Sequence, residues 1–203
     1  MNGDALSDLV LVLACGSAAT IGWRRRPLHT AALALIGAAA ALGVLRYSGL
    51  AAAQLPHRWL SLAAACIALP LLAHAHSCWL AGRAESAGRT AVAIVPLGLL
   101  AGAAAVGGWP LLSQALPALA GVWILLAMLR LRHWLGAASA ALMLAGFATL
   151  VLAPPGMRHA AWLSAVQVLH YAMAAGLLGM AWATRDVADT APLAPRGARK
   201  TPN

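Results

Sequence analysis

The sequence predicts an all-α, polytopic membrane protein: a bundle of seven transmembrane helices with its N-terminus outside and its C-terminus in the cytoplasm. The first observation is composition. Of the 203 residues, 62% are hydrophobic and 9% are charged, whereas an average soluble domain is about 45–50% apolar and about 25% charged. Secondly, stretches of the roughly 20 apolar residues that a helix needs to cross a bilayer occur seven times. Thirdly, basic residues gather in alternate connections between these stretches.

Arg, Pro and Gly residues separate the seven stretches. The first follows Asn2, Gly3 and Asp4 and lacks the basic start and the small-residue cleavage site of a signal peptide, so we expect it to remain as a helix. The second follows three arginines and Pro27. The predicted spans are 5–23, 29–49, 59–82, 90–108, 112–130, 134–153 and 161–184. Residues 1–184 therefore form the membrane domain, and residues 185–203 form a polar, disordered cytoplasmic tail.

Prolines and small residues characterise the middle and last spans. Pro70, Pro96 and Pro117 lie inside the third, fourth and fifth spans and predict kinks, because proline removes a hydrogen bond from a helix. Helices in lipid associate through close backbone approach. Gly98 with Gly102, and Ala172 with Gly176, have the four-residue spacing of small residues that permits such contact.

Basic residues set the expected orientation, since cytoplasmic connections collect Lys and Arg. With seven spans, one face carries 11 of the 14 basic residues and the other face carries 3. The 11 are Arg24, Arg25, Arg26, Arg83, Arg89, Arg130, Arg132, Arg185, Arg196, Arg199 and Lys200; the 3 are Arg46, Arg58 and Arg158. An even number of spans would not keep the basic residues separated between the two faces of the membrane in this way. The richness in Ala and Arg indicates a bacterial source, hence the cytoplasmic (inner) membrane.

Several function classes lack their residues. The only lysine is Lys200 in the tail, so no retinal Schiff base can form in the last span. No carboxylate lies at mid-membrane, where proton pumps usually carry one. The scattered basic residues form no nucleic-acid-binding face, and no phosphate-binding loop or hydrolase motif is present. Cys15, Cys66 and Cys78 lie in apolar segments and form no disulfide framework.

The seventh span carries the densest group of polar residues. Ser164, Gln167, His170 and Tyr171 follow one another at spacings of three, three and one, which places them along one helical stripe. Two interpretations stay open. His170 binds a metal, a proton or a substrate, or it is a histidine hydrogen-bonded within the bundle.

Asp8 lies near the outer end of the first span, and Arg46 lies near the outer end of the second. Antiparallel neighbours bring these two to the same depth, so we expect an ion pair that lowers the cost of burying both charges. The alternative is an outward-facing polar cavity, where Asp8, Arg46, Tyr47, His57 and Gln167 contact a substrate or ion. We predict that this cavity is lined by the first, second and seventh spans, with Ser164, His170 and Tyr171 as further candidate residues.

The third span suggests a metal site. Cys66, Pro70, His74 and Cys78 follow one another at four-residue steps, and a His and a Cys one turn apart can share a zinc or copper ion. Further ligands would come from Cys15, His29, His133 or His170; the alternative is that these are core residues. Haem would need two histidines at one depth, whereas His170 lies near mid-membrane and His74 nearer the cytoplasm.

The seven spans, Asp8 in an early helix and His170 in the last helix resemble the superfamily of membrane metal hydrolases that includes the alkaline ceramidases and the progestin and adipoQ receptors. The resemblance implies a zinc ion bound by three histidines, with Ser and Asp nearby, that activates water to cleave a lipid amide. By this resemblance His170 would be a zinc ligand, and Asp8 or Ser164 would support it. The last helix departs from the family's His-x-x-x-His motif, since Ala174 follows His170 by four residues.

Two functions therefore remain as hypotheses. The first is an integral inner-membrane protein that binds a lipid, a small ligand or a partner subunit through the outward-facing cavity. A membrane protein partner or a second copy of the chain would then be its partner, besides membrane lipids. The second is a zinc-dependent intramembrane hydrolase that acts on a lipid amide or ester, with His170, His74 and Cys78 as the candidate metal ligands.

Overall fold

A computed structural model describes residues 2–22, 26–81, 83, 85, 87–109, 111–152, 158–160 and 163–185 and confirms the all-helical class. The expected tail lies, beyond Arg185, outside the described residues. The elements are α1 (Gly3–Gly22), α2 (Pro27–Tyr47), the 3-10 turn η1 (Ala51–Ala53), α3 (Gln54–Ala63), the π-helical turn η2 (Ala64–Ala68), α4 (Leu69–Leu80), α5 (Ala87–Val106), α6 (Leu111–Arg130), α7 (Trp134–Leu152), the short antiparallel strands β1 (Arg158–Ala160) and β2 (Leu163–Ser164), and α8 (Ala165–Ala183).

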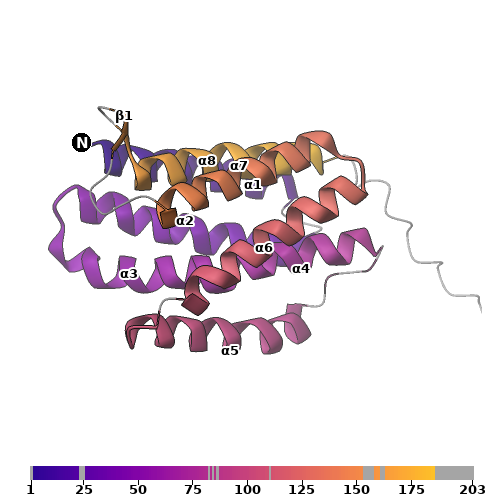
Figure 1. Cartoon of the computed structure of the whole chain (residues 1–203), viewed down its shortest axis with the longest axis horizontal. Helices are drawn as coiled ribbons and strands as arrows, with labels where there is room; N and C mark the ends of the chain where they lie inside the picture. Colours follow the sequence, from indigo (N-terminus) through magenta and orange to yellow (C-terminus); the bar gives the residue numbers. More distant parts are fainter. Residues whose placement is uncertain are drawn as a thin grey trace, which may run out of the picture.

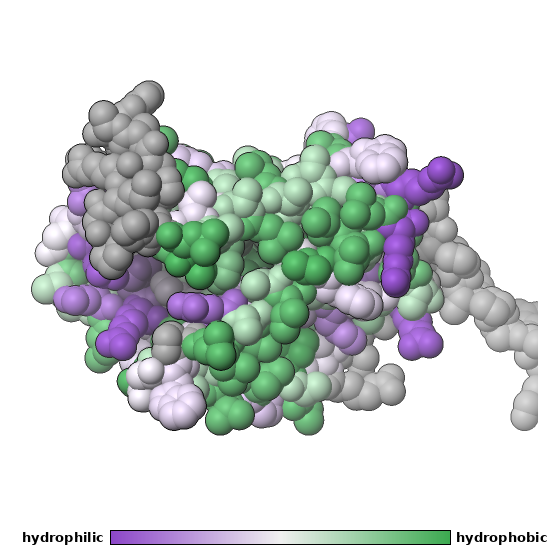
Figure 2. Space-filling model, in the orientation of Figure 1, coloured by the Kyte–Doolittle hydropathy of each residue, from purple (hydrophilic) through white to green (hydrophobic). Residues whose placement is uncertain are grey.

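Within the described ranges, six helical stretches are long and apolar enough to cross a membrane, which indicates a multi-pass membrane protein. They are Gly3–Ile21, Pro27–Tyr47, Ala51–Leu80, Leu111–Arg130, Trp134–Leu152 and Ala165–Ala183. The expected span 90–108 corresponds to α5, whose apolar stretch Thr90–Val106 is shorter. On the face drawn in Figure 2, hydrophobic side chains cover the middle of the bundle and hydrophilic ones gather toward its two ends.

The six long helical stretches form a closed ring. Contacts run from α1 to α2, from α2 to the continuous helix of α3, η2 and α4, and on through α6, α7 and α8 back to α1. Helix α5 packs outside this ring against η2 and α6, and Figure 1 shows it along one edge of the bundle. The core between the helices contains fully buried Leu33, Leu72, Ile124 and Leu177.

Pro70 explains the π-helical turn in the third long stretch. A proline has no N–H, and its ring clashes with the carbonyl four residues earlier, which here belongs to Cys66. The helix widens into a π turn over Ala64–Ala68, a distortion that typically interrupts α-helices at single turns. Gly98 of α5 packs against this turn, because a Cβ atom on Gly98 would collide with Ile67 and the carbonyl of Cys66.

Small residues bring α7 and α8 together, as the spacing of Ala172 and Gly176 predicts. A Cβ atom on Gly176 would collide with Met143, and one on Gly146 would collide with Ala172. Gly102 differs, since a Cβ atom there would have open space around it. The contact predicted for α5 is therefore confirmed at Gly98 alone.

Candidate functional site

Polar side chains gather at one end of the bundle, where the N-termini of α1 and α8 meet. We call this group the α1–α8 cluster. Its members are Asp4, Ser7 and Asp8 from α1, Ser164 at the N-cap of α8, and Gln167 and His170 from α8. The spacing of Asp4, Ser7 and Asp8 places them on one face of α1, and that face lies against α8.

Ser164 and Gln167 start α8 and attach it to α1. The Ser164 hydroxyl accepts from the backbone N–H of Gln167, whose side chain in turn accepts from the Ser164 backbone N–H at 3.2 Å, a capping box. The Gln167 amide donates to Asp4 Oδ1 at 2.7 Å, and the Ser164 hydroxyl donates to the same oxygen at 3.2 Å. Two predicted cavity residues therefore stabilise a helix terminus and a helix contact. The sequence predicts that the seventh span begins at residue 161, whereas α8 begins at Ala165, directly after this cap.

His170 lies one turn deeper, with its Nδ1 atom between two residues of α1. Nδ1 is 3.2 Å from the Ser7 hydroxyl oxygen and 3.1 Å from Asp8 Oδ1. The Ser7 hydroxyl can donate its hydrogen to the carbonyl of Asp4 at 2.9 Å, which leaves the Ser7 oxygen to accept from the imidazole. On this basis we assign the imidazole hydrogen to Nδ1. In the neutral imidazole the lone pair is then on Nε2.

Asp8 is a carboxylate almost completely removed from solvent, with 1% of the residue exposed. Oδ1 lies at ion-pair distance from His170, yet neither carboxylate oxygen accepts a hydrogen bond from a described residue. Leaving a buried acceptor without a donor costs about 1–3 kcal/mol. Gly43 of α2 makes room for this carboxylate, because a Cβ atom on Gly43 would collide with Oδ2.

This arrangement leaves two groups able to accept hydrogen bonds. No described residue donates to Nε2 of His170, whose side chain keeps 15% of its surface exposed. The oxygens of Asp8 are the second group. An imidazole whose other nitrogen is fixed by a hydrogen bond is oriented for binding a ligand or accepting a proton at the free nitrogen. The site is therefore suited to a donor such as a hydroxyl or an amine.

The expected ion pair of Asp8 with Arg46 does not form. The Arg46 guanidinium lies over the ring of Tyr47, 5.0 Å from its centre, and Asp8 instead contacts Gly43, one turn earlier on α2. The Tyr47 ring meets His57 edge to face at 5.9 Å. His57 is buried, and its Nδ1 atom lies 3.0 Å from the carbonyl of Ala39. These residues flank the α1–α8 cluster and do not bond to it through their side chains.

Tyr171 follows His170 in the predicted stripe and does not join the cluster. It is partly exposed, and no hydrogen bond links it to another residue of the described part. In a helix, adjacent residues differ in direction by about 100°, so Tyr171 lies on the neighbouring face of α8. The stripe is therefore interrupted after His170.

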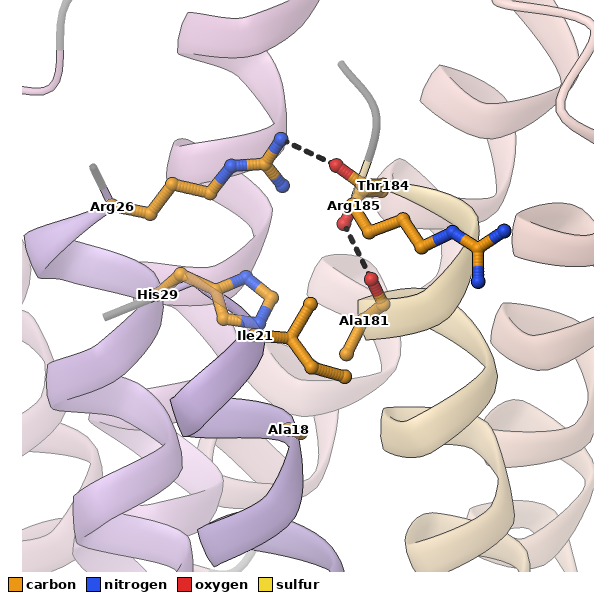
Figure 3. A pocket seen from close by; sticks show the side chains of 7 residues that line it. All are labelled: Ala18, Ile21, Arg26, His29, Ala181, Thr184 and Arg185. Carbon is orange, nitrogen blue, oxygen red and sulfur yellow. Dashed lines mark hydrogen bonds between the residues drawn. The ribbon is translucent and has the colours of Figure 1, made fainter. Parts of the chain in front are cut away.

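The opposite end of the bundle holds a second polar group. Arg26 donates to the carbonyl of Thr184 at 2.8 Å, linking the start of α2 to the end of α8 (Figure 3). The His29 side chain, drawn beside Ile21 in Figure 3, borders a cavity of about 10 Å³, room for about one water molecule. Glu85 Oε2 accepts from the Leu28 N–H at 2.7 Å. Burial raises the pKa of the Glu85 carboxyl above its ordinary value, and this hydrogen bond opposes the rise.

His74 and Cys78 belong to this second end, and their side chains touch as their spacing predicts, with Nε2 and Sγ 3.4 Å apart. The structure does not bring His170 to them. The three cysteines are free and buried. His133, another candidate ligand, lies against Trp79 with the two rings tilted and their centres 5.5 Å apart.

The zinc site implied by the family resemblance does not fit the residues that the structure describes. Three histidines would have to converge, whereas His170 is accompanied by Asp8 and Ser7. No group of three or more His, Cys, Asp or Glu in the described ranges is arranged to hold one metal ion. The groups around His170 therefore suit hydrogen bonding and do not form a set of zinc ligands.

Sequence reasoning missed three residues of the site. Asp4 and Ser7 share a helix face with Asp8, and this spacing was a usable signal. Gly43 left no signal, because a glycine in an Ala-rich helix is unremarkable until the helix that it faces is known. Comparison of the chain with family models, with curated proteins and with solved structures finds no match in any of the three.

Proposed function

We propose that this chain is a seven-span protein of a bacterial cytoplasmic membrane, with its N-terminus outside, and that it binds a small polar ligand or a lipid headgroup at the α1–α8 cluster. A buried ionisable residue in a membrane-spanning helix is costly and usually functional. Asp8 is such a residue, and it carries two oxygens that accept no hydrogen bond from the described residues.

The contacts at the helix ends agree with seven spans, and the proposed orientation rests on the partition of basic residues. Helix α5 lies alongside the ring in Figure 1. With its first turn included it has 20 residues, which is long enough to cross a membrane. The contact of Arg26 with Thr184, and that of Trp79 with His133, join ends that the basic-residue partition assigns to the cytoplasm. The contact of Asn2 with the carbonyl of Tyr47, at 3.0 Å, joins ends assigned to the outside.

One observation carries the binding function: His170 Nδ1 is at hydrogen-bond distance from Ser7 and at ion-pair distance from Asp8, while Nε2 has no partner among the described residues. A ligand hydroxyl, amide or ammonium group would donate to Nε2. The carboxylates of Asp4 and Asp8 favour a neutral or cationic ligand over an anion. Lipid headgroups that carry hydroxyl or amine groups meet this requirement, as do small polyols and amines.

The experiment is native mass spectrometry of the detergent-purified protein, followed by identification of released molecules. We expect a bound small molecule or lipid in the parent and in His133→Ala, a control at the opposite end of the bundle. We expect its loss in His170→Ala. Retention of the bound molecule by His170→Ala to the same extent as by the parent would contradict the proposal. So would a parent protein that carries no bound molecule after purification from vesicles of total membrane lipid.

A further inference from the structure

A small cavity lies where the end of α1, the start of α2 and the end of α8 meet, and its polar lining is cationic or neutral. The cavity measures about 10 Å³ and is bordered by Arg26, His29, Thr184 and Arg185. Apolar residues of α1 and α8 complete the lining, and no carboxylate is among the described residues that border it. The cavity is therefore suited to a group that accepts hydrogen bonds.

His29 is buried against this cavity without a hydrogen-bond partner. Only 3% of the residue is exposed, and neither ring nitrogen bonds to a described residue. The ring of His76 is near, with the two ring centres 5.9 Å apart, but its Nδ1 atom bonds to the carbonyl of Leu72 at 2.7 Å. A neutral imidazole has one N–H donor, and buried donors nearly always have an acceptor. The His29 ring, which faces Ile21 and Ala181 in Figure 3, therefore calls for an acceptor in the cavity.

Arg26 supplies a guanidinium group at the same cavity. It donates to the carbonyl of Thr184 at 2.8 Å and lies over the ring of Trp79, 5.7 Å from its centre. These two contacts position the guanidinium, which forms no salt bridge with a described carboxylate. The carboxylate of Glu85 attracts it electrostatically but accepts from the N–H of Leu28. Since a guanidinium has five N–H donors, Arg26 keeps donors for an anion.

The size and the depth of the cavity indicate the kind of anion. Room for about one water molecule admits one oxygen atom of a phosphate group, while the rest of the phosphate stays outside beside Arg26. Guanidinium groups match the geometry of phosphate. Trp182 lies close by in the chain, is 57% exposed and is covered by the Arg185 guanidinium at 3.6 Å. Tryptophan prefers the membrane–water interface, which is the depth of lipid phosphates.

We propose that Arg26 and His29 bind the phosphate of an anionic phospholipid at this end of the bundle. One phosphate oxygen accepts from the His29 N–H inside the cavity, and the other oxygens accept from Arg26. Arg185 adds positive charge at the rim, which favours an anionic headgroup over a zwitterionic one. Basic pockets between transmembrane helices bind anionic headgroups in this way. The site lies at the opposite end from His170 and goes beyond the proposed ligand-binding function.

Native mass spectrometry of the detergent-purified full chain, titrated with phosphatidylglycerol or phosphatidylcholine of the same acyl chains, tests the proposal. We expect phosphatidylglycerol to bind about fivefold more tightly or better, the effect of roughly one basic residue on an anionic lipid. Arg26→Gln should weaken the Kd for phosphatidylglycerol roughly tenfold, and His29→Leu roughly fivefold, because each removes a hydrogen bond to a charged group. Arg130→Gln, which removes an equal charge from the exposed end of α6, is the matched control and should keep the Kd.

Arg26→Gln also removes the contact with Thr184, so thermal unfolding without added lipid checks each variant, and His29→Leu tests the site with that contact intact. Equal Kd values for the two lipids would overturn the proposal, as would equal losses in Arg26→Gln and Arg130→Gln or an unchanged Kd in His29→Leu. Inorganic phosphate that binds the parent as tightly as phosphatidylglycerol would overturn a lipid as the source of the phosphate. His170→Ala should keep the Kd for phosphatidylglycerol, so this proposal and the proposed function fail separately.

Discussion

His170 on α8 and Asp8 on α1 meet with Nδ1 and Oδ1 3.1 Å apart, although the two residues belong to opposite ends of the chain. The contact closes the ring of helices, since α8 packs between α7 and α1. A polar partner at this distance lowers the cost of holding the Asp8 carboxylate inside the bundle.

Gly43→Ala should disturb this pair without touching either member. The added methyl group would collide with the carboxylate of Asp8, and overpacking of this kind typically costs about 1–3 kcal/mol. Chemical unfolding in detergent measures the change. Gly16→Ala is the control, because a Cβ atom there meets nothing within 4 Å. Equal stability of the two variants would show that Asp8 does not press against α2.

Ser164→Ala should weaken the start of α8. The substitution removes the acceptor for the Gln167 N–H and one donor to Asp4, and loss of an N-cap typically costs about 0.5–2 kcal/mol. Thermal unfolding of the two purified proteins compares them. Ser17→Ala removes an exposed hydroxyl that forms no side-chain hydrogen bond with a described residue, and it should leave the midpoint unchanged. A larger drop of the unfolding midpoint in Ser17→Ala than in Ser164→Ala would contradict the role of Ser164 as the N-cap of α8.

Gly176→Ala should loosen the contact of α7 with α8. A Cβ atom on Gly176 would collide with Met143 and would lie 2.8 Å from the carbonyl of Ser139, so one of the helices has to shift. We expect a loss of about 1–3 kcal/mol, measured by denaturant unfolding. Gly102→Ala has open space around the new methyl group and should be neutral. A greater loss of stability in Gly102→Ala than in Gly176→Ala would contradict the close contact of α7 with α8 at Gly176.

Local features of the sequence predicted the helices well. Length and apolar content locate them, and Pro70 explains where the third long stretch widens into a π turn. The capping box was also readable, because a Ser followed three residues later by Gln before an apolar run is its signature. Ser164 and Gln167 were nevertheless interpreted as cavity residues, since a polar stripe in a span suggests function before it suggests a helix cap.

The partner of Asp8 could not be predicted from local features. Charge alone favours Arg46, which the chain places at a similar depth on the next helix. The choice depends on which face of α1 meets which helix, and Gly43 allows Asp8 to pack on α2 while His170 approaches from α8. Such a choice is a property of the assembled bundle, so no periodicity within one segment reveals it.

The hydrogen on Nδ1 of His170 is the most direct test of the site. Nitrogen-15 spectra of histidine-labelled protein in detergent micelles, with the His170 signals assigned through His170→Gln, report which ring nitrogen is protonated. We predict that Nδ1 carries a hydrogen in the parent and that Ser7→Ala with Asp8→Asn reduces this preference. A neutral ring protonated at Nε2 alone would contradict the orientation by Ser7 and Asp8, and with it the free acceptor on which ligand binding depends.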